Sequence, residues 1–502
     1  MIKVDQRKLM NLGLLISGAC ATAALVLISN RALLYIGATL GVAVLLTYVL
    51  AAFVSGNSQG LVPIWALLYP LGYYFLSFPM DHPIFTFDRA FVAVLAAVLV
   101  VRSLQHPHFR PLPKNMFYAG LSWVGFLLIA LISLRDVRGH GLLYSVRLLN
   151  DTFVMPGILA YYVLRRFDLR RQLAALGVVV SVMSIYLAGI GMAEDILRRD
   201  LLSFTPENVA MLGNTEMFRA NGPFESGSTY GLVGVINFLL LRFLTSIQPP
   251  GLPSWQRILQ RIGTFSAFLV SLIPMHRGIV VTWVVIGLIE AWQHRTNPAW
   301  WKHTAWKRIG LFVLFGLGVI VIKVASPYIY QDRFEDASNI QARLAQHQQS
   351  LAVLADNLWL GAGFGQFTQV VEDETKYQFF YQGVPSINYP HNTLLNVATE
   401  TGLLGLSLFV VSQIFLVAAC RQLLLKPGKN LAWWTFISVF VSYWVFGMDV
   451  SIGYLSELNM WYMFALAICI RYAWTDSSSS RSERADVRAG IAPLVHSYSI
   501  PN

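Results

Sequence analysis

Apolar runs long enough to cross a lipid bilayer recur along this chain from one end to the other, and they limit its fold more than any other feature. A helix needs about 20 mostly apolar residues to cross the hydrocarbon core. Because lipid offers the backbone no hydrogen-bond partners, spanning segments are either helices or strands of a closed barrel. These runs are continuous, whereas barrel strands alternate apolar and polar residues. The sequence therefore predicts an all-α, polytopic membrane protein.

The length rule gives about fourteen membrane-spanning helices. We expect them near residues 11–29, 33–54, 60–79, 86–101, 117–134, 150–164, 173–193, 229–246, 260–275, 279–293, 309–326, 402–420, 432–448 and 455–474. Short or Pro-containing runs in this set are also compatible with re-entrant helices. The first run could be mistaken for a signal peptide, but it is long and no clear cleavage site follows, so we interpret it as a retained span. Only 13% of the 502 residues are charged, against about a quarter in soluble proteins.

Most Lys and Arg residues lie in segments that share one side of the membrane with the N-terminus. Cytoplasmic loops carry such an excess of positive charge, so both termini are predicted to be cytoplasmic. The net charge of +11 then sets topology, and we expect no nucleic-acid partner. Cys20, Cys420 and Cys469 lie inside apolar runs and offer neither a disulfide framework nor metal-ligand spacing.

Two long segments, about 194–228 and 327–401, fall on the opposite, outer side. Within the second, Leu344, Leu351 and Leu358 recur at helical spacing between polar residues, which predicts an amphipathic helix over Ile340–Trp359. We expect this helix to lie against the outer membrane face. The last residues, 475–502, are Ser-rich and charged, which predicts a disordered cytoplasmic tail.

Three arginines on the outer side stand out, namely Arg219, Arg277 and Arg343, and Arg219 is a candidate ligand for phosphate. A guanidinium binds phosphate through two parallel hydrogen bonds. Arg219 stands in a Gly/Pro-rich turn at the membrane edge. Arg277 lies in a very short outer turn, where the charge bias disfavours it. The alternative for both is a contact with lipid headgroups.

A second candidate is His391, which opens an apolar helical stretch with Asn392 beside it and Glu400 further along. An imidazole can act as a general base near neutral pH. The alternative is a polar cluster that caps the helix. The preceding Gly361-x-Gly363-x-Gly365 looks superficially like a nucleotide loop, but no strand precedes it and no Gly-Lys-Ser/Thr follows.

Taken in their order along the chain, these motifs resemble those of the bacterial O-antigen ligase and polymerase superfamily. Its His-Asn signature is similar to Pro390-His391-Asn392-Thr393 followed by Glu400-Thr401-Gly402. The other similar pieces are Arg219-x-x-Gly222-x-Phe224, Arg277-Gly278, and Arg343 followed by Gly361-x-Gly363-x-Gly365. Two positions depart from the superfamily: Glu225-Ser226 stands where Pro-Asn is common, and His276 replaces the usual Ser before the turn arginine.

The resemblance implies a helical membrane glycosyltransferase of the GT-C-like type in the bacterial inner membrane. The transmembrane domain would cover 1–474, with 327–401 as its periplasmic catalytic loop. The implied donor is a glycan linked to undecaprenyl diphosphate within the membrane lipid. The acceptor is the hydroxyl of another glycan repeat unit or of lipid A–core. No cofactor and no metal are implied, and a chain-length regulator is an open partner.

The resemblance also implies roles for residues. His391 would be the base, and Arg219 and Arg343 would stabilise the leaving diphosphate with support from Arg277. Asn392 and Glu400 would support the substrate site, and Glu225 is a rival base. The absent Pro-Asn slightly favours an exopolysaccharide polymerase over a ligase, and both stay open.

Two other classes of function compete with glycosyl transfer. A transporter or flippase would explain the polar Asn150 and Asp151 within a predicted span, because polar side chains are costly in lipid. It would not explain why arginines and a His-Asn pair gather on one side. A non-catalytic membrane scaffold for polysaccharide assembly is the second competitor.

Overall fold

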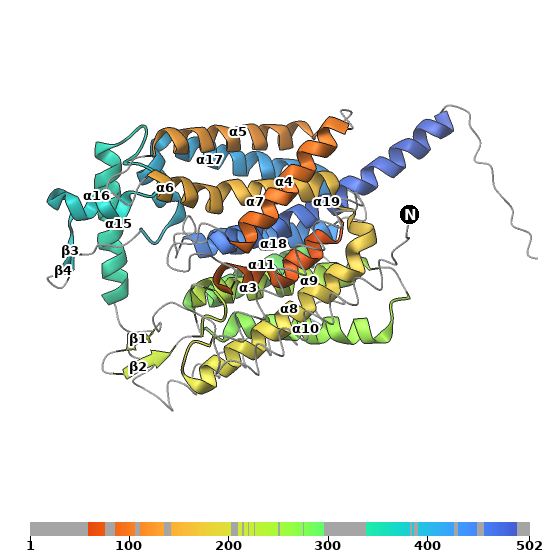
Figure 1. Ribbon diagram of the computed structural model, residues 1–502, viewed down its shortest axis with the longest axis horizontal. Helices are drawn as coiled ribbons and strands as arrows, with labels where there is room; N and C mark the ends of the chain where they lie inside the picture. Colours follow the sequence, from red (N-terminus) through yellow and green to blue (C-terminus); the bar gives the residue numbers. More distant parts are fainter. Residues whose placement is uncertain are drawn as a thin grey trace, which may run out of the picture.

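The protein is seen here in a computed structural model. It describes residues 59–75, 86–105, 111–134, 142–201, 209–212, 215–218, 220–224, 226–248, 251–274, 276–295, 338–381, 384–385, 390–425, 430–448 and 456–488. The expected spans near 11–29, 33–54 and 309–326 lie outside these residues. The described helices lie side by side as a bundle, with α15, α16 and the β3–β4 hairpin at one end (Figure 1). The C-terminal part of α19 projects from the opposite end (Figure 1).

The described elements are helices, apart from two short hairpins. The helices of the first half are α3 (Leu61–Phe75), α4 (Phe87–Gln105), α5 (Lys114–Ile132), α6 (Leu142–Leu149), the π-helical turn η1 (Asn150–Val154), α7 (Met155–Arg166) and α8 (Leu169–Leu197). Those of the second half are α9 (Gly227–Ile247), α10 (Ser254–Leu272), α11 (Arg277–Gln293), α15 (Ser338–Asp356), α16 (Phe367–Asp373), the 3-10 turn η4 (Thr375–Tyr377), α17 (Thr393–Leu424), α18 (Asn430–Gly447) and α19 (Ser456–Arg488). The antiparallel hairpins pair β1 (Val209–Leu212) with β2 (Thr215–Phe218), and β3 (Phe380–Tyr381) with β4 (Val384–Pro385). Both hairpins fall within the two long segments expected on the outer side.

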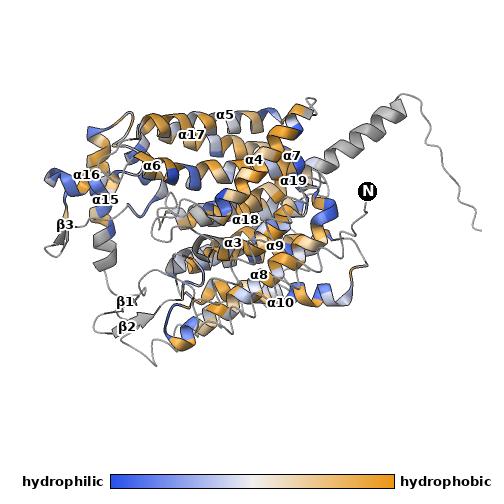
Figure 2. Cartoon of the chain, in the orientation of Figure 1, coloured by the Kyte–Doolittle hydropathy of each residue, from blue (hydrophilic) through white to orange (hydrophobic). Residues whose placement is uncertain are grey.

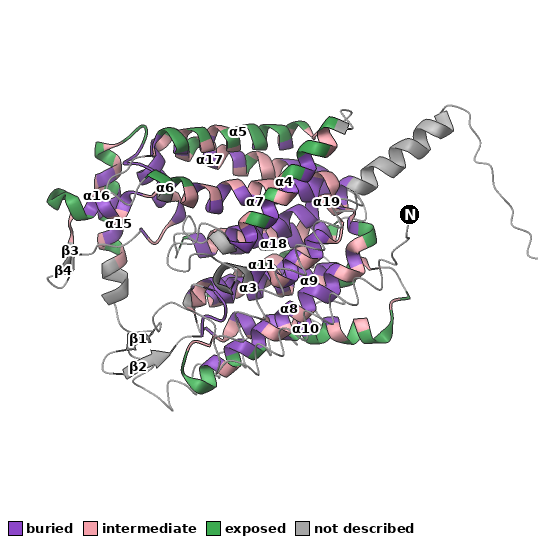
Figure 3. Cartoon of the chain, viewed as in Figure 1, coloured by how far each residue is buried: buried purple, intermediate pink, exposed green. Residues whose placement is uncertain are grey.

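Four of the described helices are long and apolar enough to cross a membrane, namely α5, α8, α9 and α17. Shorter apolar stretches lie at Leu61–Leu71 and Gly278–Gln293. Hydrophobic residues run along the bundle helices (Figure 2), and α5 exposes many of them on its outward face (Figure 3). On that face Leu121, Leu128 and Ile132 are each more than half exposed. A continuous apolar surface of this kind indicates contact with lipid. The chain is thus a helical membrane protein, while the total of fourteen spans and the GT-C type stay predictions.

Small residues bring α8, α9 and α10 into close contact. A Cβ atom added to Gly263 on α10 would lie 2.5 Å from the Cα of Ser181 on α8. One added to Gly234 on α9 would lie 2.6 Å from the backbone nitrogen of Ser271 on α10. Membrane helices that lack a large side chain at the contact can approach in this way.

Residues 475–502 were expected to form a disordered tail, and the structure differs over the first part of this segment. Helix α19 does not end near residue 474 but continues to Arg488, so residues 475–488 are helical. Ser, Asp, Glu and Arg all tolerate helical geometry when a preceding helix supplies the nucleus. Residues 489–502 lie outside the described part of the chain.

Candidate functional site

Helix α17 is broken near its start, and the break positions the candidate site. Gly402 has φ 68°, a left-handed conformation within an otherwise helical run. The break leaves backbone N–H groups without helical partners. The segment after α15 supplies acceptors for two of them: the N–H of Leu403 donates to the carbonyl of Leu358 (2.8 Å), and that of Leu404 donates to Trp359 (3.4 Å).

The glycine-rich loop that follows α15 is fastened to the same break. Gly361, Gly363 and Gly365 have φ values of 72°, 119° and 74°, which residues with a Cβ atom adopt rarely. A Cβ atom on Gly361 would also lie 2.3 Å from the backbone of Glu400. The N–H of Ala362 donates to the carbonyl of Thr399 (2.8 Å). The Gly-x-Gly-x-Gly motif therefore serves to dock this loop on α17.

The carboxylate of Glu400 completes this contact. Its side chain is 1% exposed and accepts hydrogen bonds from the backbone N–H groups of Gly365 and Phe367. Gln366 between them donates to the hydroxyl of Ser145 on α6 (2.7 Å). Glu400 thus holds the loop in place, and the loop in turn contacts the start of the α6–η1–α7 helix.

Helix α15 occupies the segment where an amphipathic helix was expected, and it carries two groups that act on His391. Arg343 and His347 lie one turn apart, and α15 packs against α17. Burial, together with the charges of Arg343 and His347, lowers the pKa of His391 to about 4. Burial and then Arg343 also lower the pKa of His347. Arg343 and His347 on α15 therefore act electrostatically on His391 at the start of α17, while the catalytic roles of Arg343 and His391 stay predictions.

Asn392 has a defined local role. It is the N-cap of α17, where its side-chain oxygen accepts the N–H of Leu395 (3.1 Å). Its side-chain nitrogen donates to the sulfur of Met448 at the end of α18 (3.6 Å). The helix-cap alternative thus describes Asn392. His391 lies just outside the cap, and at neutral pH its low pKa leaves the imidazole uncharged.

The turn before α11 lies at the same end of the bundle. His276, which stands where the superfamily has Ser, caps α11 by accepting the N–H of Gly278 (3.2 Å). Its ring lies 5.5 Å from that of Phe446 on α18. Because Phe446 is two residues from Met448, the end of α18 joins this turn to the start of α17. Arg277 is the first residue of α11; its side chain lies outside the described part of the structure.

Arg219 and Glu225 also lie outside the described residues, but the turn between them is described. Gly222 has φ 57°, and its N–H donates to the carboxylate of Glu194 at the end of α8 (2.8 Å). Phe224 is buried against Tyr230 of α9. This turn therefore has a fixed backbone on the side that follows Arg219.

Part of this chain is similar to a known protein family. Residues 262–410 match the family model described as O-Antigen ligase. This match supports the resemblance of the chain to the O-antigen ligase/polymerase superfamily. No curated protein matches the chain.

The O-antigen ligase domain starts within α10 and ends within α17, so it includes Arg277, Arg343 and His391. Arg219 and Glu225 precede it. His347 lies inside the domain, and the sequence offered a signal for it: it is four residues from Arg343 on one expected helix. Among the described residues, no group of three or more His, Cys, Asp or Glu side chains is arranged to hold a metal ion.

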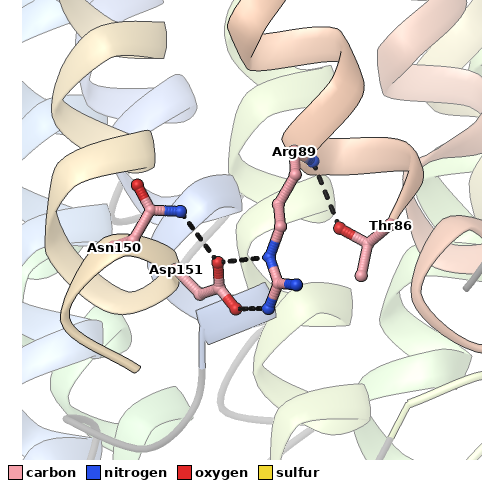
Figure 4. A network of polar contacts seen from close by, with 4 residues as sticks. All are labelled: Thr86, Arg89, Asn150 and Asp151. Atoms are coloured by element: carbon pink, nitrogen blue, oxygen red, sulfur yellow. Dashed lines mark hydrogen bonds and ion pairs between the residues drawn. The ribbon is translucent and has the colours of Figure 1, made fainter. Parts of the chain in front are cut away.

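A second polar network lies outside the O-antigen ligase domain, within the bundle (Figure 4). Arg89 on α4 donates to both carboxylate oxygens of Asp151 in η1, one of them at 2.8 Å. Asn150 donates to the same carboxylate (3.1 Å), and the hydroxyl of Thr86 accepts the N–H of Arg89 (3.2 Å). The polar residues that suggested a transporter are therefore paired with an arginine from a neighbouring helix, which lowers the cost of burying each charge.

Proposed function

We propose that this protein transfers a glycan from undecaprenyl diphosphate to a hydroxyl acceptor at the periplasmic face of the bacterial inner membrane. The match of residues 262–410 to the O-antigen ligase model supports glycosyl transfer of the O-antigen ligase or polymerase type. The observation that carries the finer proposal is that α15 packs against α17, and that Arg343 on α15 acts electrostatically on His391 at the start of α17. The two residues have complementary proposed roles in such a transfer.

The proposed reaction is a displacement at the anomeric carbon. The acceptor oxygen forms a bond to that carbon while the bond from the carbon to the diphosphate oxygen breaks. The proton of the acceptor hydroxyl passes to the imidazole of His391, and the electron pair leaves with the lipid diphosphate. A positioned base of this kind contributes typically 10² to 10⁴ in rate. Arg343 stabilises the charge that develops on the leaving diphosphate, with Arg219 and Arg277 in the same proposed role.

The environment of His391 supports its proposed role as a base. A pKa of about 4 keeps the imidazole neutral at pH 7, so its nitrogen is free to accept a proton. The neighbouring Arg343 opposes the imidazolium that then forms. An anionic diphosphate between the two groups offsets this repulsion. His391 would therefore be a stronger base when the donor is bound than when the site is empty.

The arrangement of basic residues supports the proposed orientation. The helix formed by α6, η1 and α7 starts beside the glycine-rich loop, at Ser145, and ends at Arg166. At 1.5 Å per residue it covers about 30 Å, the thickness of the hydrocarbon core. Around its far end Arg166 lies near Arg102, and Arg471 donates to the carbonyls of Leu164 and Phe167 (2.7 and 2.8 Å). Basic residues of membrane proteins gather on the cytoplasmic side. We therefore assign the far end of α7 to the cytoplasm and the end with α15 to the periplasm.

The proposal includes no cofactor or metal. The diphosphate link of the donor supplies the free energy of transfer, and cationic side chains take the role that a metal ion has in many phosphoryl-handling sites. The acceptor is either a further repeat unit, for a polymerase, or lipid A–core, for a ligase. A chain-length regulator is a proposed partner of the polymerase alternative only.

The test is reconstitution of the full-length protein in vesicles with a carrier-linked glycan. Offering lipid A–core in one reaction and only donor in another separates ligase from polymerase products. Arg343→Ala and His391→Ala should each lower the rate of transfer by about 100-fold or more. Gln348→Ala is the matched control, because Gln348 is an exposed residue of the same helix α15. Transfer by both variants at the control rate contradicts the proposed roles, and glycan movement across the bilayer without transfer favours a flippase.

A further inference from the structure

We propose that His347 is an additional donor-binding residue, which contacts the diphosphate beside Arg343 on the same face of α15. This inference rests on the proposed function, because it names a further contact to the same donor. It concerns a residue that lies outside the motifs in which the resemblance was found.

The first observation is that α15 buries several polar side chains and exposes two leucines. Its polar residues Gln346, Gln349 and Ser350 are buried, each at 4% exposure or less. Its apolar residues Leu344 and Leu351 are exposed at 57% and 56%. An ordinary surface helix in water has the opposite arrangement. The exposed leucines suit contact with lipid, and the buried amides suit a polar interior.

The second observation is the place of His347 on this helix. With 3.6 residues per turn, Arg343 and His347 lie on one face, between the buried amides and the exposed leucines. Both are partly buried. A lipid-linked diphosphate also has an apolar part and a polar part: its hydrocarbon chain stays in lipid, while its charged group needs polar contacts. The diphosphate of the donor would therefore lie at the boundary between the buried amides and the exposed leucines of α15.

The third observation is that polar atoms at this boundary have unmet hydrogen-bonding capacity. Nε2 of His347 is inaccessible to solvent and has no hydrogen-bond partner among the described residues. The same holds for Oε1 of Gln346 and for both polar side-chain atoms of Gln349. Buried polar groups without partners are costly, and a bound ligand that supplies partners removes this cost.

The fourth observation is the placement of the three charged or titratable groups. Arg343 acts electrostatically on both imidazoles, and His347 acts on His391 across the contact of α15 with α17. An anion bound beside Arg343 would meet His347 one turn further along α15 and His391 on the facing helix. His391 is then placed for the acceptor hydroxyl, and His347 for the diphosphate.

Inorganic pyrophosphate is the probe that separates this inference from the proposed function, because its binding needs no turnover. We expect the wild-type protein in nanodiscs to bind pyrophosphate in calorimetry. His347→Ala should weaken that binding about tenfold, the effect of losing one hydrogen bond to a charged group. It should raise the KM for donor similarly, with a smaller change in kcat. His347→Arg, which supplies N–H donors at the same position, should recover the affinity, and Gln348→Ala should match the wild type.

The outcomes are distinct. If His347→Ala binds pyrophosphate as tightly as Gln348→Ala does, or if the wild type does not bind it, the inference is wrong. If the wild type binds pyrophosphate with the expected pattern but transfers no glycan, the proposed function fails while the anion site stands. His347→Gln, which keeps a neutral polar side chain of similar size, replaces His347→Ala if the alanine variant does not fold.

Discussion

Two turns of this protein carry motif residues, and each is held by a buried glutamate from a long neighbouring helix. Glu400 of α17 accepts N–H groups of the glycine-rich loop, and Glu194 of α8 accepts those of Gly222 and Leu201. The glutamates are 1% and 0% exposed. The two turns differ in what surrounds them: the loop docks backbone against backbone, whereas Gly222 faces the ring of Tyr230. The first contact therefore leaves less room for adjustment than the second.

The largest expected effect on transfer is that of an alanine at Gly402, because its neighbour is backbone and not a side chain. A Cβ atom at Gly402 would lie 2.2 Å from the backbone of Trp359, in a conformation that already disfavours alanine. Gly402→Ala should therefore separate α15 from α17 and abolish transfer in the vesicle assay. At Gly222 the Cβ atom would meet the side chain of Tyr230 at 2.8 Å, so Gly222→Ala should retain measurable activity. Gly120→Ala, with nothing within 4 Å, is the control. Equal activity of Gly402→Ala and Gly120→Ala contradicts the docking role.

An intermediate effect is expected from removing the carboxylates. Glu400→Ala and Glu194→Ala each leave two backbone N–H groups without an acceptor, at about 1–3 kcal/mol for each group. We expect Glu400→Ala to lower transfer by about 10- to 100-fold, because the freed loop is continuous with the helix that carries Arg343. Glu194→Ala should lower transfer about tenfold if Arg219 contacts the donor, since the released turn follows that residue. Comparing donor KM for the two variants is the measurement. A normal KM in Glu194→Ala removes the support for Arg219.

The smallest effect is a displacement of the pH profile. Because burial, Arg343 and His347 hold the pKa of His391 in the empty site at about 4, kcat/KM for transfer should be independent of this group near pH 7 and fall only as the pH approaches 4. Arg343→Lys keeps a cation and should leave this acid limb near its place. Arg343→Gln should move it toward the ordinary histidine value of 6.5. The measurement is the residual kcat/KM of Arg343→Gln as a function of pH. If its fall at low pH occurs at the same pH as in the wild type, Arg343 does not act on the imidazole.

The same depressed pKa has a consequence for stability. The unfolded chain binds a proton at His391 below about pH 6.5, whereas the folded chain does so only near pH 4. The stability contributed by the neutral imidazole is therefore fully present above pH 6.5 and is lost as the pH falls toward 4. His391→Gln should flatten this dependence of thermal stability in nanodiscs.

The sequence predicted the elements that depend on local pattern and missed those that depend on tertiary contact. Apolar runs placed the described bundle helices to within a few residues at most ends, and the helical spacing of leucines placed α15. The docking function of Gly361, Gly363 and Gly365 was not predicted, because it requires knowing that α17 breaks at Gly402. A Gly inside an apolar run gives no sign of a left-handed conformation by itself.

The candidate site shows the same division. Arg343 and His391 were chosen from motifs, and in the structure Arg343 acts electrostatically on His391; their roles, like those of Arg219 and Glu225, stay predictions. The support that Glu400 was expected to give the substrate site also stays a prediction, and its hydrogen bonds to backbone N–H groups were not foreseen. The pairing of Arg89 with Asp151 was not predicted, since 62 residues separate them and only the packing of α4 beside η1 joins them.

The break at Gly402 has a mechanical consequence. It separates the short segment 393–401 from the long segment 403–424, and the residues that follow α15 are hydrogen-bonded to the last residues of the first and to the first residues of the second. A change in bilayer thickness tilts long apolar helices. Because the break allows the rest of the long segment to tilt relative to the short one, we expect the spacing between Arg343 and His391 to change little. Rates of transfer should consequently be similar in vesicles of short and long acyl chains, and a steep dependence on chain length would show that the two segments move as one.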